Sequence, residues 1–415
     1  MANENTTYVY LHTQYGFEPV GILTMQQANR DSISTFAYGR RYLEKSHAVA
    51  IDPVQLPLLP DAFHTKGVFR AFQDASPDAW GRHLLDRAAE EHGLIPTEFD
   101  YLTAQNQSLR IGAMRFGADL MGPSMARPSW RPPVIAGEHL NLEQMLASVD
   151  AILDNEEFAP HYHRFLDRGS SVGGAQPKAL TDYNGRNCIA KFSQALEAWP
   201  TCRTELAAMR LAARCGITVP YCEVVNVGGR DVFLIERFDR QGQKPRHFLS
   251  AMTLIGSDTM TQGSYSDIAM VIRKYSNPNA IQNELEELFR RMVFNVLVNN
   301  YDDHLRNHGF LYDTVSQFWS LSPAYDIVPQ PLRDESSIST LTLTVGKYGK
   351  QASLDNALSE YSIYGLTRDK AKCIVQDMVS IVREHWKEEN YTAGVSYDKL
   401  QSVRVAYRAA LNKVP

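Results

Sequence analysis

The stretch NNYDDHLRNHGFLYD, residues 299–313, places two aspartates, two histidines and several amides directly after a long helical pattern. The preceding segment, residues 283–300, has apolar residues that recur at the period of a helix, namely Leu285, Leu288, Phe289, Met292, Val296 and Leu297. The polar stretch is therefore expected where a buried helix ends. Metal binding, general-base catalysis and a purely structural polar loop are all open at this point.

The spacing within the stretch favours one chemistry. Asp302 precedes Asn307 by five positions, and Asp326 follows in LSPAYDIVP, residues 321–329. Asp, Asn and Asp in this order are what phosphoryl transfer from ATP requires, the first for the hydroxyl proton and the others for Mg²⁺. In the protein-kinase catalytic loop the catalytic Asp also precedes its Asn by five residues, which selects Asp302 over Asp303.

Two upstream charges fit the same chemistry. The strand pattern CIAKFS, residues 188–193, places Lys191 among apolar neighbours, as in the phosphate-binding lysine strand of kinases. Glu205 lies on the following helical pattern, residues 204–216, and is a natural ion-pair partner for Lys191. Taken alone, such a lysine is usually a solvated edge residue and such a glutamate an exposed helix charge, so the argument rests on their order along the chain.

Two further segments are candidates for nucleotide contact. SSVGGAQPK, residues 170–178, contains paired glycines that let backbone amides approach a phosphate, although it matches neither GxGxxG nor GxxxxGK[ST]. A tight turn is the alternative. ERFDR, residues 236–240, follows the last strand pattern of this region, where a hinge would offer its backbone to an adenine edge. An ordinary charged turn is the alternative there.

The coarse pattern predicts an α+β protein. Strand-like segments open the chain at residues 7–13, 18–25 and 34–43, and a helix is expected over residues 76–93 with Ser76 as its N-cap. Residues 178–238 then show the order strand, strand, helix, strand, strand, with Gly216 closing the helix. The remainder is mainly helical.

Bulk properties limit the function classes. A chain of 415 residues exceeds what one core usually supports, so two or three packed units are expected. The net charge of −5 gives no overall basic field for nucleic acid or membranes. Five cysteines without close CxxC pairs suggest neither a disulfide framework nor a zinc site. With no signal-like N-terminus and no membrane-length apolar run, a cytoplasmic location is predicted.

The motifs together resemble a known family. SSVGGAQPKAL, CIAKF, LIERFDR, NNYDDHLRNHGF and LSPAYDIVP resemble the HipA-type kinases, the toxin components of bacterial toxin–antitoxin pairs. VYLHTQYGFEPVGIL and SPDAWGRHLLDR resemble that family's opening domain. The resemblance implies a serine/threonine protein kinase with a protein-kinase-like two-lobed α+β fold, a mixed α/β N-terminal region and an all-helical C-terminal domain. The expected parts are residues 1–135, 136–245 and 246–415.

The resemblance also implies roles for individual residues, with ATP and Mg²⁺ as cofactors. Asp302 would be the catalytic base, Asn307 and Asp326 the magnesium ligands, and Glu205 the partner of Lys191. The implied ATP contacts are Gly173, Gly174, Ala175, Gln176, Pro177, Lys178, Lys191, Glu236, Arg237, Phe238 and His304. The family's autophosphorylated serine corresponds to Ser171, with Ser170 as a second candidate, and a phosphate there would repel the nucleotide and eject the loop.

The implied partners are a protein substrate with a serine or threonine acceptor and a HipB-like DNA-binding antitoxin. Any DNA contact would come from that partner, and no membrane is involved. Two departures from expected patterns are visible: Arg306 stands where the family often has lysine, and Asp326 is followed by Ile-Val, where protein kinases have Phe-Gly. A guanidinium positions phosphate differently from an ammonium, so the substitution bears on the reaction rate.

Three other interpretations stay open. A metal-dependent hydrolase would use Asp302, Asp303, His304, His308 and Asp326, but it leaves Lys191 and the loop at 173–178 without a role. A pseudokinase would bind nucleotide or an antitoxin without catalysis. A small-molecule kinase would use the same Asp, Asn and Asp geometry on a different acceptor.

Overall fold

The computed structural model describes residues 3–28, 31–124, 128, 130, 140–154, 162–170, 176–194, 197–331 and 339–412. The chain forms two compact units. The first comprises residues 1–192, 239–249 and 311–317, and the second comprises residues 193–238, 250–310 and 318–415. In the described part of the chain, no helix has the length and apolar character needed to cross a membrane. The three-part division at residues 135 and 245 stays a prediction.

The first unit opens with a five-stranded antiparallel sheet of strand order β4-β3-β2-β1-β5. Its strands are β1 (Asn3–Thr13), β2 (Gly16–Ala28), β3 (Asp31–Tyr38), β4 (Ala62–Lys66) and β5 (Met114–Gly117). The short helix α2 (Arg70–Asp74) brings Phe72 to within ring-contact distance of Phe36 on β3 and Phe116 on β5, at 5.8 and 6.0 Å between centroids. These buried rings form part of the core that holds the sheet.

The prediction of a single strand over residues 34–43 was wrong for the second half of this segment. Strand β3 ends at Tyr38, and helix α1 (Arg40–Leu43) follows. The Gly39 amide still bonds to the Val20 carbonyl at 2.9 Å, whereas the Gly39 carbonyl accepts from the amides of Tyr42 and Leu43. Gly39 is therefore the point at which sheet bonding gives way to the first helical turn.

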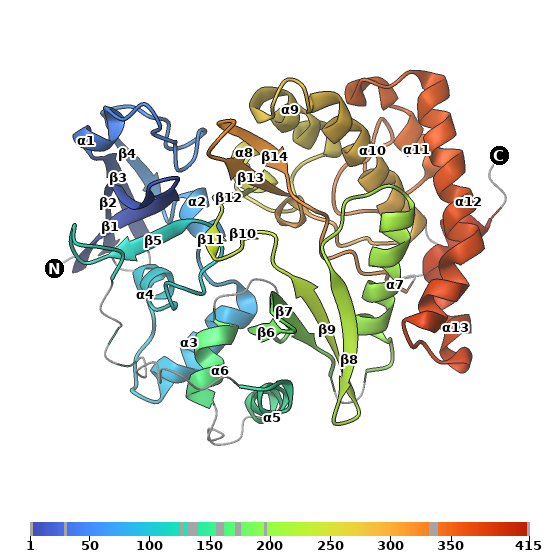
Figure 1. The fold of residues 1–415 in the computed structure, drawn as a ribbon, viewed down its shortest axis with the longest axis horizontal. Coiled ribbons are helices and arrows are strands. Elements are labelled where there is room, and N and C mark those ends of the chain that lie inside the picture. Colours follow the sequence, from blue (N-terminus) through green and yellow to red (C-terminus); the bar gives the residue numbers. More distant parts are fainter. Residues whose placement is uncertain are drawn as a thin grey trace. The chain divides into compact units, whose positions relative to one another are not determined.

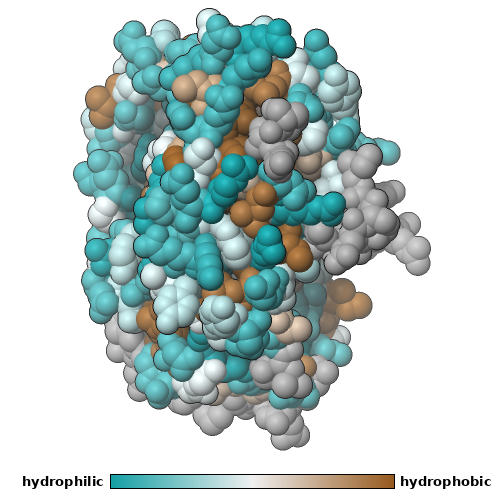
Figure 2. Space-filling view, turned by 90° about the vertical axis from the view of Figure 1, so that its right-hand side faces the viewer, coloured by the Kyte–Doolittle hydropathy of each residue, from teal (hydrophilic) through white to brown (hydrophobic). Residues whose placement is uncertain are grey.

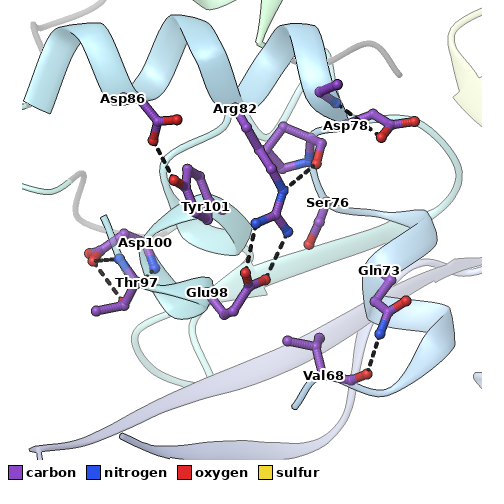
Figure 3. Close-up of polar contacts among 12 residues, drawn as sticks. Val68, Gln73, Ser76, Asp78, Arg82, Asp86, Thr97, Glu98, Asp100 and Tyr101 are labelled. Atoms are coloured by element: carbon purple, nitrogen blue, oxygen red, sulfur yellow. Dashed lines mark hydrogen bonds and ion pairs between the residues drawn. The ribbon is translucent and has the colours of Figure 1, made fainter. Parts of the chain in front are cut away.

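Helices α3 (Ala79–Glu90) and α4 (Glu98–Thr103) are joined by polar contacts between their side chains (Figure 3). Arg82 forms two bonds with the Glu98 carboxylate, at 2.6 and 2.8 Å, and its guanidinium lies 4.3 Å from the centre of the Tyr101 ring. The Tyr101 hydroxyl donates to Asp86 (Figure 3). This cluster fixes α4 against the polar face of α3, whose other face is buried.

Asp78, and not Ser76, is the N-cap of α3, so the prediction of Ser76 was wrong. The Asp78 carboxylate accepts from the Ala79 amide, and the helix begins at Ala79. Ser76 instead donates its hydroxyl to the Phe72 carbonyl at 2.9 Å, which closes the preceding helix α2. Serine and aspartate both cap helices well. Because the Ser76 hydroxyl is already bonded at the end of α2, Asp78 is the residue that caps α3.

The first unit continues with α5 (Leu142–Leu153), α6 (Tyr162–Gly169) and the hairpin of β6 (Lys178–Tyr183) and β7 (Arg186–Phe192). Asn184 and Gly185 turn this hairpin with φ values of 50° and 75°, as an Asn-Gly two-residue turn requires. Trp80 on α3 donates its indole N–H to the Lys178 carbonyl at 3.0 Å. The predicted hairpin is confirmed, and its first strand is anchored to α3.

Short strands complete the first unit and lead into the second. They are β10 (Arg240–Gln241), paired with β11 (Lys244–Pro245), and β12 (Phe248–Ser250) and β13 (Gly309–Asp313), whose residues divide between the units. The Tyr312 amide bonds to the His247 carbonyl at 2.9 Å.

The second unit contains helix α7 (Thr201–Arg214) and the hairpin of β8 (Cys222–Val227) and β9 (Arg230–Glu236). Gly216 follows α7 with φ of 76°, and Gly228 and Gly229 turn the hairpin with φ of 57° and 83°. Arg203 on α7 bonds to Asp231 on β9 at 2.5 and 2.8 Å, which joins the helix to the hairpin. The predicted helix and strands are confirmed here.

Helices make up most of the remaining second unit. They are α8 (Ala251–Ile255), α9 (Tyr265–Tyr275), α10 (Ile281–Leu297), α11 (Leu354–Leu358), α12 (Arg368–Thr392), α13 (Tyr397–Val403) and α14 (Arg408–Leu411), with 3-10 turns at Leu305–Asn307, Tyr361–Tyr364 and Arg404–Tyr407. Helix α12 packs against both α7 and α10 (Figure 1). The helical character of the C-terminal domain is confirmed, but residues 246–415 are not all helical as predicted, because they also contain strands β12, β13 and β14 (Phe318–Leu321).

Helix α12 is amphipathic. Its buried side includes Ile374, Val375, Met378, Val379 and Val382. The surface on the side of α12 and α13 is mostly hydrophilic, with hydrophobic residues in separate small groups (Figure 2). Amphipathic burial against α7 and α10 therefore accounts for this long helix.

Candidate active site

The polar stretch begins where α10 ends in a left-handed residue. Asn299 has φ of 53°, and the Asn300 amide bonds to the Asn295 carbonyl at 3.0 Å. This is the bonding of a Schellman motif, in which asparagine is one of the few residues that accept the left-handed position. The Asn299 side chain donates to the Gln330 carbonyl at 2.8 Å. The chain therefore leaves the helix in a fixed direction.

The two adjacent aspartates have opposite environments. Asp303 is buried, and its Oδ2 accepts from the Tyr265 hydroxyl at 2.5 Å and bonds to His308 Nε2 at 2.8 Å. Asp302 is exposed. An exposed carboxylate can meet an incoming hydroxyl, whereas the Asp303 oxygen is already engaged with two protein donors. The structure thus separates an exposed carboxylate from a buried structural one.

The Asp303 carboxylate belongs to a larger buried network. Asn295 on α10 donates to the Tyr265 hydroxyl at 3.1 Å, and Asn300 donates to the Asn295 side-chain oxygen at 3.0 Å. Burial, together with the Asp303 charge, raises the pKa of Tyr265 well above its usual value. The Tyr265 hydroxyl therefore stays protonated and remains a donor to Asp303.

One hydrogen bond joins the segment that contains Asn307 to the segment that contains Asp326. The Tyr325 hydroxyl donates to the Arg306 carbonyl at 2.6 Å, so the residue before Asp326 is bonded to the residue before Asn307. Asn307 is buried and Asp326 is half-buried. An amide oxygen and a carboxylate are oxygen donors of the kind Mg²⁺ prefers, so this pair fits the predicted cation.

Asp326 also has an unusual backbone. Its φ of 59° lies in the left-handed region, which most non-glycine residues avoid and which Asp and Asn accept more readily. Such residues concentrate at functional sites, where the surrounding structure holds them. At Asp326 the bond from Tyr325 and the burial of Ile327 supply that constraint.

The predicted hinge segment lies beside this pair in the second unit. The Phe238 ring lies 5.2 Å from the Tyr325 ring, and the Glu236 amide bonds to the Tyr221 carbonyl at 2.8 Å. Arg237 is buried. Residues 236–238 thus lie close to the Asp326 segment, although their predicted contact with adenine stays a prediction.

In the first unit, two lysines face each other across the β6–β7 hairpin. Lys178 and Lys191 are direct partners in the antiparallel register, and each is only 6% exposed. Side chains of directly opposite residues in an antiparallel pair lie on the same face, so the register places both lysines on one face of the hairpin. Their binding of phosphate stays a prediction.

The residues before Lys178 are only partly described. The Gln176 side chain donates to the Phe192 carbonyl at 3.3 Å, and the Pro177 carbonyl accepts from the Phe192 amide at 3.0 Å. Both contacts hold the end of the predicted phosphate loop against β7. Four of the predicted site residues, Ser171, Gly173, Gly174 and Ala175, lie outside the described residues.

Ser170, the second candidate for phosphorylation, is completely buried. Its carbonyl lies so close to Gly81 on α3 that a Cβ there would approach it to 2.9 Å. In this conformation the Ser170 hydroxyl is not accessible to a kinase active site. This burial argues against Ser170, and phosphorylation of Ser171 stays a prediction.

Glu205 and His304 complete the predicted set. Glu205 is fully buried on α7 in the second unit, while Lys191 belongs to the first, so their ion pair stays a prediction. His304 caps the 3-10 turn that contains Asn307, and its carbonyl accepts from the Asn307 amide at 2.9 Å. The nucleotide contact predicted for His304 also stays a prediction.

Sequence reasoning missed the roles of Tyr265, Tyr325 and His308. Tyr265 lies 38 residues before Asp303, and no local pattern connects them. Tyr325 could have been noticed because it directly precedes Asp326. Among the described residues, no group of three His, Cys, Asp or Glu side chains is arranged to hold a metal ion.

The fold and site define an α+β protein with a lysine-bearing hairpin and an Asp-x₄-Asn loop followed by a left-handed aspartate. Residues 9–117 match the HipA N-terminal domain and residues 170–386 match the HipA-like C-terminal domain. The chain therefore belongs to the HipA family, as the sequence motifs predicted.

Relatives and a solved structure agree with this assignment. A protein of Haemophilus influenzae named "Putative kinase" is 30% identical over 249 residues, covering 51% of this chain and 72% of that protein. "Putative kinase Y4mE" of Sinorhizobium fredii is 26% identical over 296 residues, covering 63% and 69%. A chain in the Shewanella oneidensis HipA, HipB and operator DNA complex has a similar fold, with a TM-score of 0.65, 18% identity and coverage of 98% and 96%.

Proposed function

We propose that this chain is an ATP- and Mg²⁺-dependent serine/threonine protein kinase. The observation that carries the proposal is the contrast between exposed Asp302 and buried Asp303, in a loop whose Arg306 carbonyl accepts a hydrogen bond from Tyr325, the residue before Asp326. Asp302 is thus the carboxylate that can meet a hydroxyl group, and two oxygen donors for a hard cation lie in the same unit.

In this proposal each site residue has a separate role in phosphoryl transfer. Bound ATP would supply the γ-phosphoryl group and Mg²⁺ would offset its charge. Asp302 orients the acceptor hydroxyl and takes its proton as the new O–P bond forms and the bond to the ADP oxygen breaks. Lys178 and Lys191 bind phosphate oxygens, and Asn307 and Asp326 hold the cation. The backbone of residues 236–238 provides the adenine contacts.

The proposal includes self-inactivation at Ser171. A phosphate there adds about two negative charges beside a loop suited to phosphate binding, so repulsion would displace the loop. The burial of Ser170 supports Ser171 as the acceptor.

The proposed partner is a HipB-like DNA-binding antitoxin, and the proposed location is the cytoplasm. The related fold from Shewanella oneidensis is in a complex with HipB and operator DNA. This chain has a net charge of −5, so any DNA contact is assigned to the partner.

The test starts from dephosphorylated protein incubated with Mg²⁺ and ATP, followed by peptide mass spectrometry of residues 170–178. Phosphate is expected on Ser171 in the wild type and absent in Asp302→Asn. Asp377→Asn is the matched control, because Asp377 is an exposed aspartate on α12 of the same unit. Nucleotide binding without phosphate on any peptide would overturn the protein-kinase proposal. Phosphorylated metabolites would then point to a small-molecule kinase.

A further inference from the structure

Two pairs of residues in the loop share one spacing. Asp302 and Asn307, the proposed base and cation ligand, are five positions apart, and so are Asp303 and His308. Each member of the second pair directly follows a member of the first. A bond between Asp303 and His308 therefore links the two residues that directly follow Asp302 and Asn307.

That bond is present and buried. Asp303 Oδ2 lies 2.8 Å from His308 Nε2, and the two residues are 3% and 2% exposed. Within the described residues, His308 Nδ1 has no hydrogen-bond partner, so Asp303 is the polar anchor of this imidazole. In a buried site of low dielectric such a hydrogen bond is stronger than at the surface.

The ends of the loop are also fixed by backbone bonds. The Tyr301 carbonyl accepts from the Thr342 amide at 2.9 Å, and the His308 carbonyl accepts from the Ala251 amide at 2.7 Å. These bonds hold the chain on either side, but neither acts on the side chain of Asp302 or Asn307. Between them, the Asp303–His308 bond joins two side chains of the loop.

Tyr265 fixes the orientation of the Asp303 carboxylate. Its hydroxyl donates to the same Oδ2 atom, and its ring packs edge-on against His308 at 5.7 Å between centroids and an angle of 84°. Asn295 in turn donates to the Tyr265 hydroxyl. Hydrogen bonds therefore connect the loop to helices α9 and α10.

We propose that Asp303, His308 and Tyr265 are positioning residues, which hold Asp302 and Asn307 at the separation that phosphoryl transfer needs. This inference rests on the proposed kinase function. None of the three contacts substrate in the proposal. They act through the residue that precedes Asp303 or His308, so their loss lowers turnover more than nucleotide binding.

Tyr265→Phe tests the proposal against a matched control, Tyr407→Phe. Both tyrosines are fully buried in the second unit, and the hydroxyl of each accepts from an asparagine side chain, Asn295 at 3.1 Å and Asn390 at 2.9 Å. The measurements are kcat, the KM for ATP and the thermal unfolding temperature. Both variants should lose thermal stability, and Tyr265→Phe should lose more because its hydroxyl also donates to the buried Asp303 carboxylate. Tyr265→Phe should lose about 10- to 100-fold in kcat at unchanged KM, while Tyr407→Phe keeps the wild-type kcat.

Variants of His308 provide a second test. Glutamine can place an amide nitrogen near the position of imidazole Nε2, so His308→Gln should keep most of the kcat that His308→Ala loses. If Tyr265→Phe and His308→Ala alter only stability and leave kcat unchanged, the positioning role is wrong while the kinase proposal stands. If the wild type transfers no phosphate, the kinase proposal itself fails.

Discussion

The lysine hairpin and the Asp302–Asn307 loop hold their functional side chains by different means. Lys178 and Lys191 are placed by strand register, which depends on backbone bonds and an Asn-Gly turn. Asp302 and Asn307 lie outside regular α-helix and strand, and buried side chains fix their surroundings. The hairpin should therefore tolerate changes to most side chains except the lysines, whereas the loop should depend on residues that never meet the substrate.

Lys191→Met should have the largest effect on the hairpin side of this comparison. Methionine keeps the buried apolar stem but removes the phosphate-binding charge, so kcat/KM for ATP should fall about 100-fold, equivalent to about 3 kcal/mol. The unfolding free energy without nucleotide is measured separately, so that the loss of protein contacts of the buried lysine is distinguished from the loss of phosphate binding. Steady-state kinetics and urea unfolding measure the two quantities, and a large stability loss with normal kinetics would contradict the phosphate role.

Asp326→Asn tests the cation pair on the loop side. Asparagine accepts the left-handed backbone that Asp326 has, so the fold should be retained while the carboxylate charge is lost. The Mg²⁺ concentration for half-maximal activity should rise about tenfold, equivalent to about 1.4 kcal/mol of cation binding. A Mg²⁺ titration at saturating ATP measures it. An unchanged Mg²⁺ requirement would remove Asp326 from the proposed site.

Gly185→Ala should give the smallest effect. Gly185 turns the lysine hairpin at φ of 75°, where alanine costs about 1–2 kcal/mol. Because the lysine register also depends on the bonds along both strands, kcat should stay within about twofold of the wild type while the unfolding free energy falls. A loss of kcat with an unchanged unfolding free energy would contradict this. It would show that the Asn-Gly turn, rather than the hydrogen bonds between the two strands, positions Lys191.

The sequence predicted those parts of the site that depend on local rules. The β6–β7 hairpin follows from apolar alternation around Asn184-Gly185, and Asp302 was chosen over Asp303 by spacing to Asn307 alone. The burial of Asp303 supports that choice.

Contacts made by tertiary packing were beyond sequence reasoning. Tyr265 reaches Asp303 from 38 residues away, and Tyr325 bonds to a main-chain carbonyl that has no sequence signature. The N-cap of α3 was missed for a related reason, since Ser76 is taken up by the helix before it. In each case, a residue or helix elsewhere in the fold determines which group the side chain bonds to.

The most direct test of the central claim compares Asp302→Asn with Asp303→Asn. Phosphate transfer from ATP, nucleotide affinity and thermal unfolding would be measured on both variants. Asp302→Asn is expected to fold and bind nucleotide like the wild type but to lose about 10²–10⁴ in transfer rate. Asp303→Asn should lose thermal stability and retain more transfer activity than Asp302→Asn. If Asp302→Asn transfers phosphate normally while Asp303→Asn is inactive at unchanged stability, the roles assigned to the two aspartates are wrong.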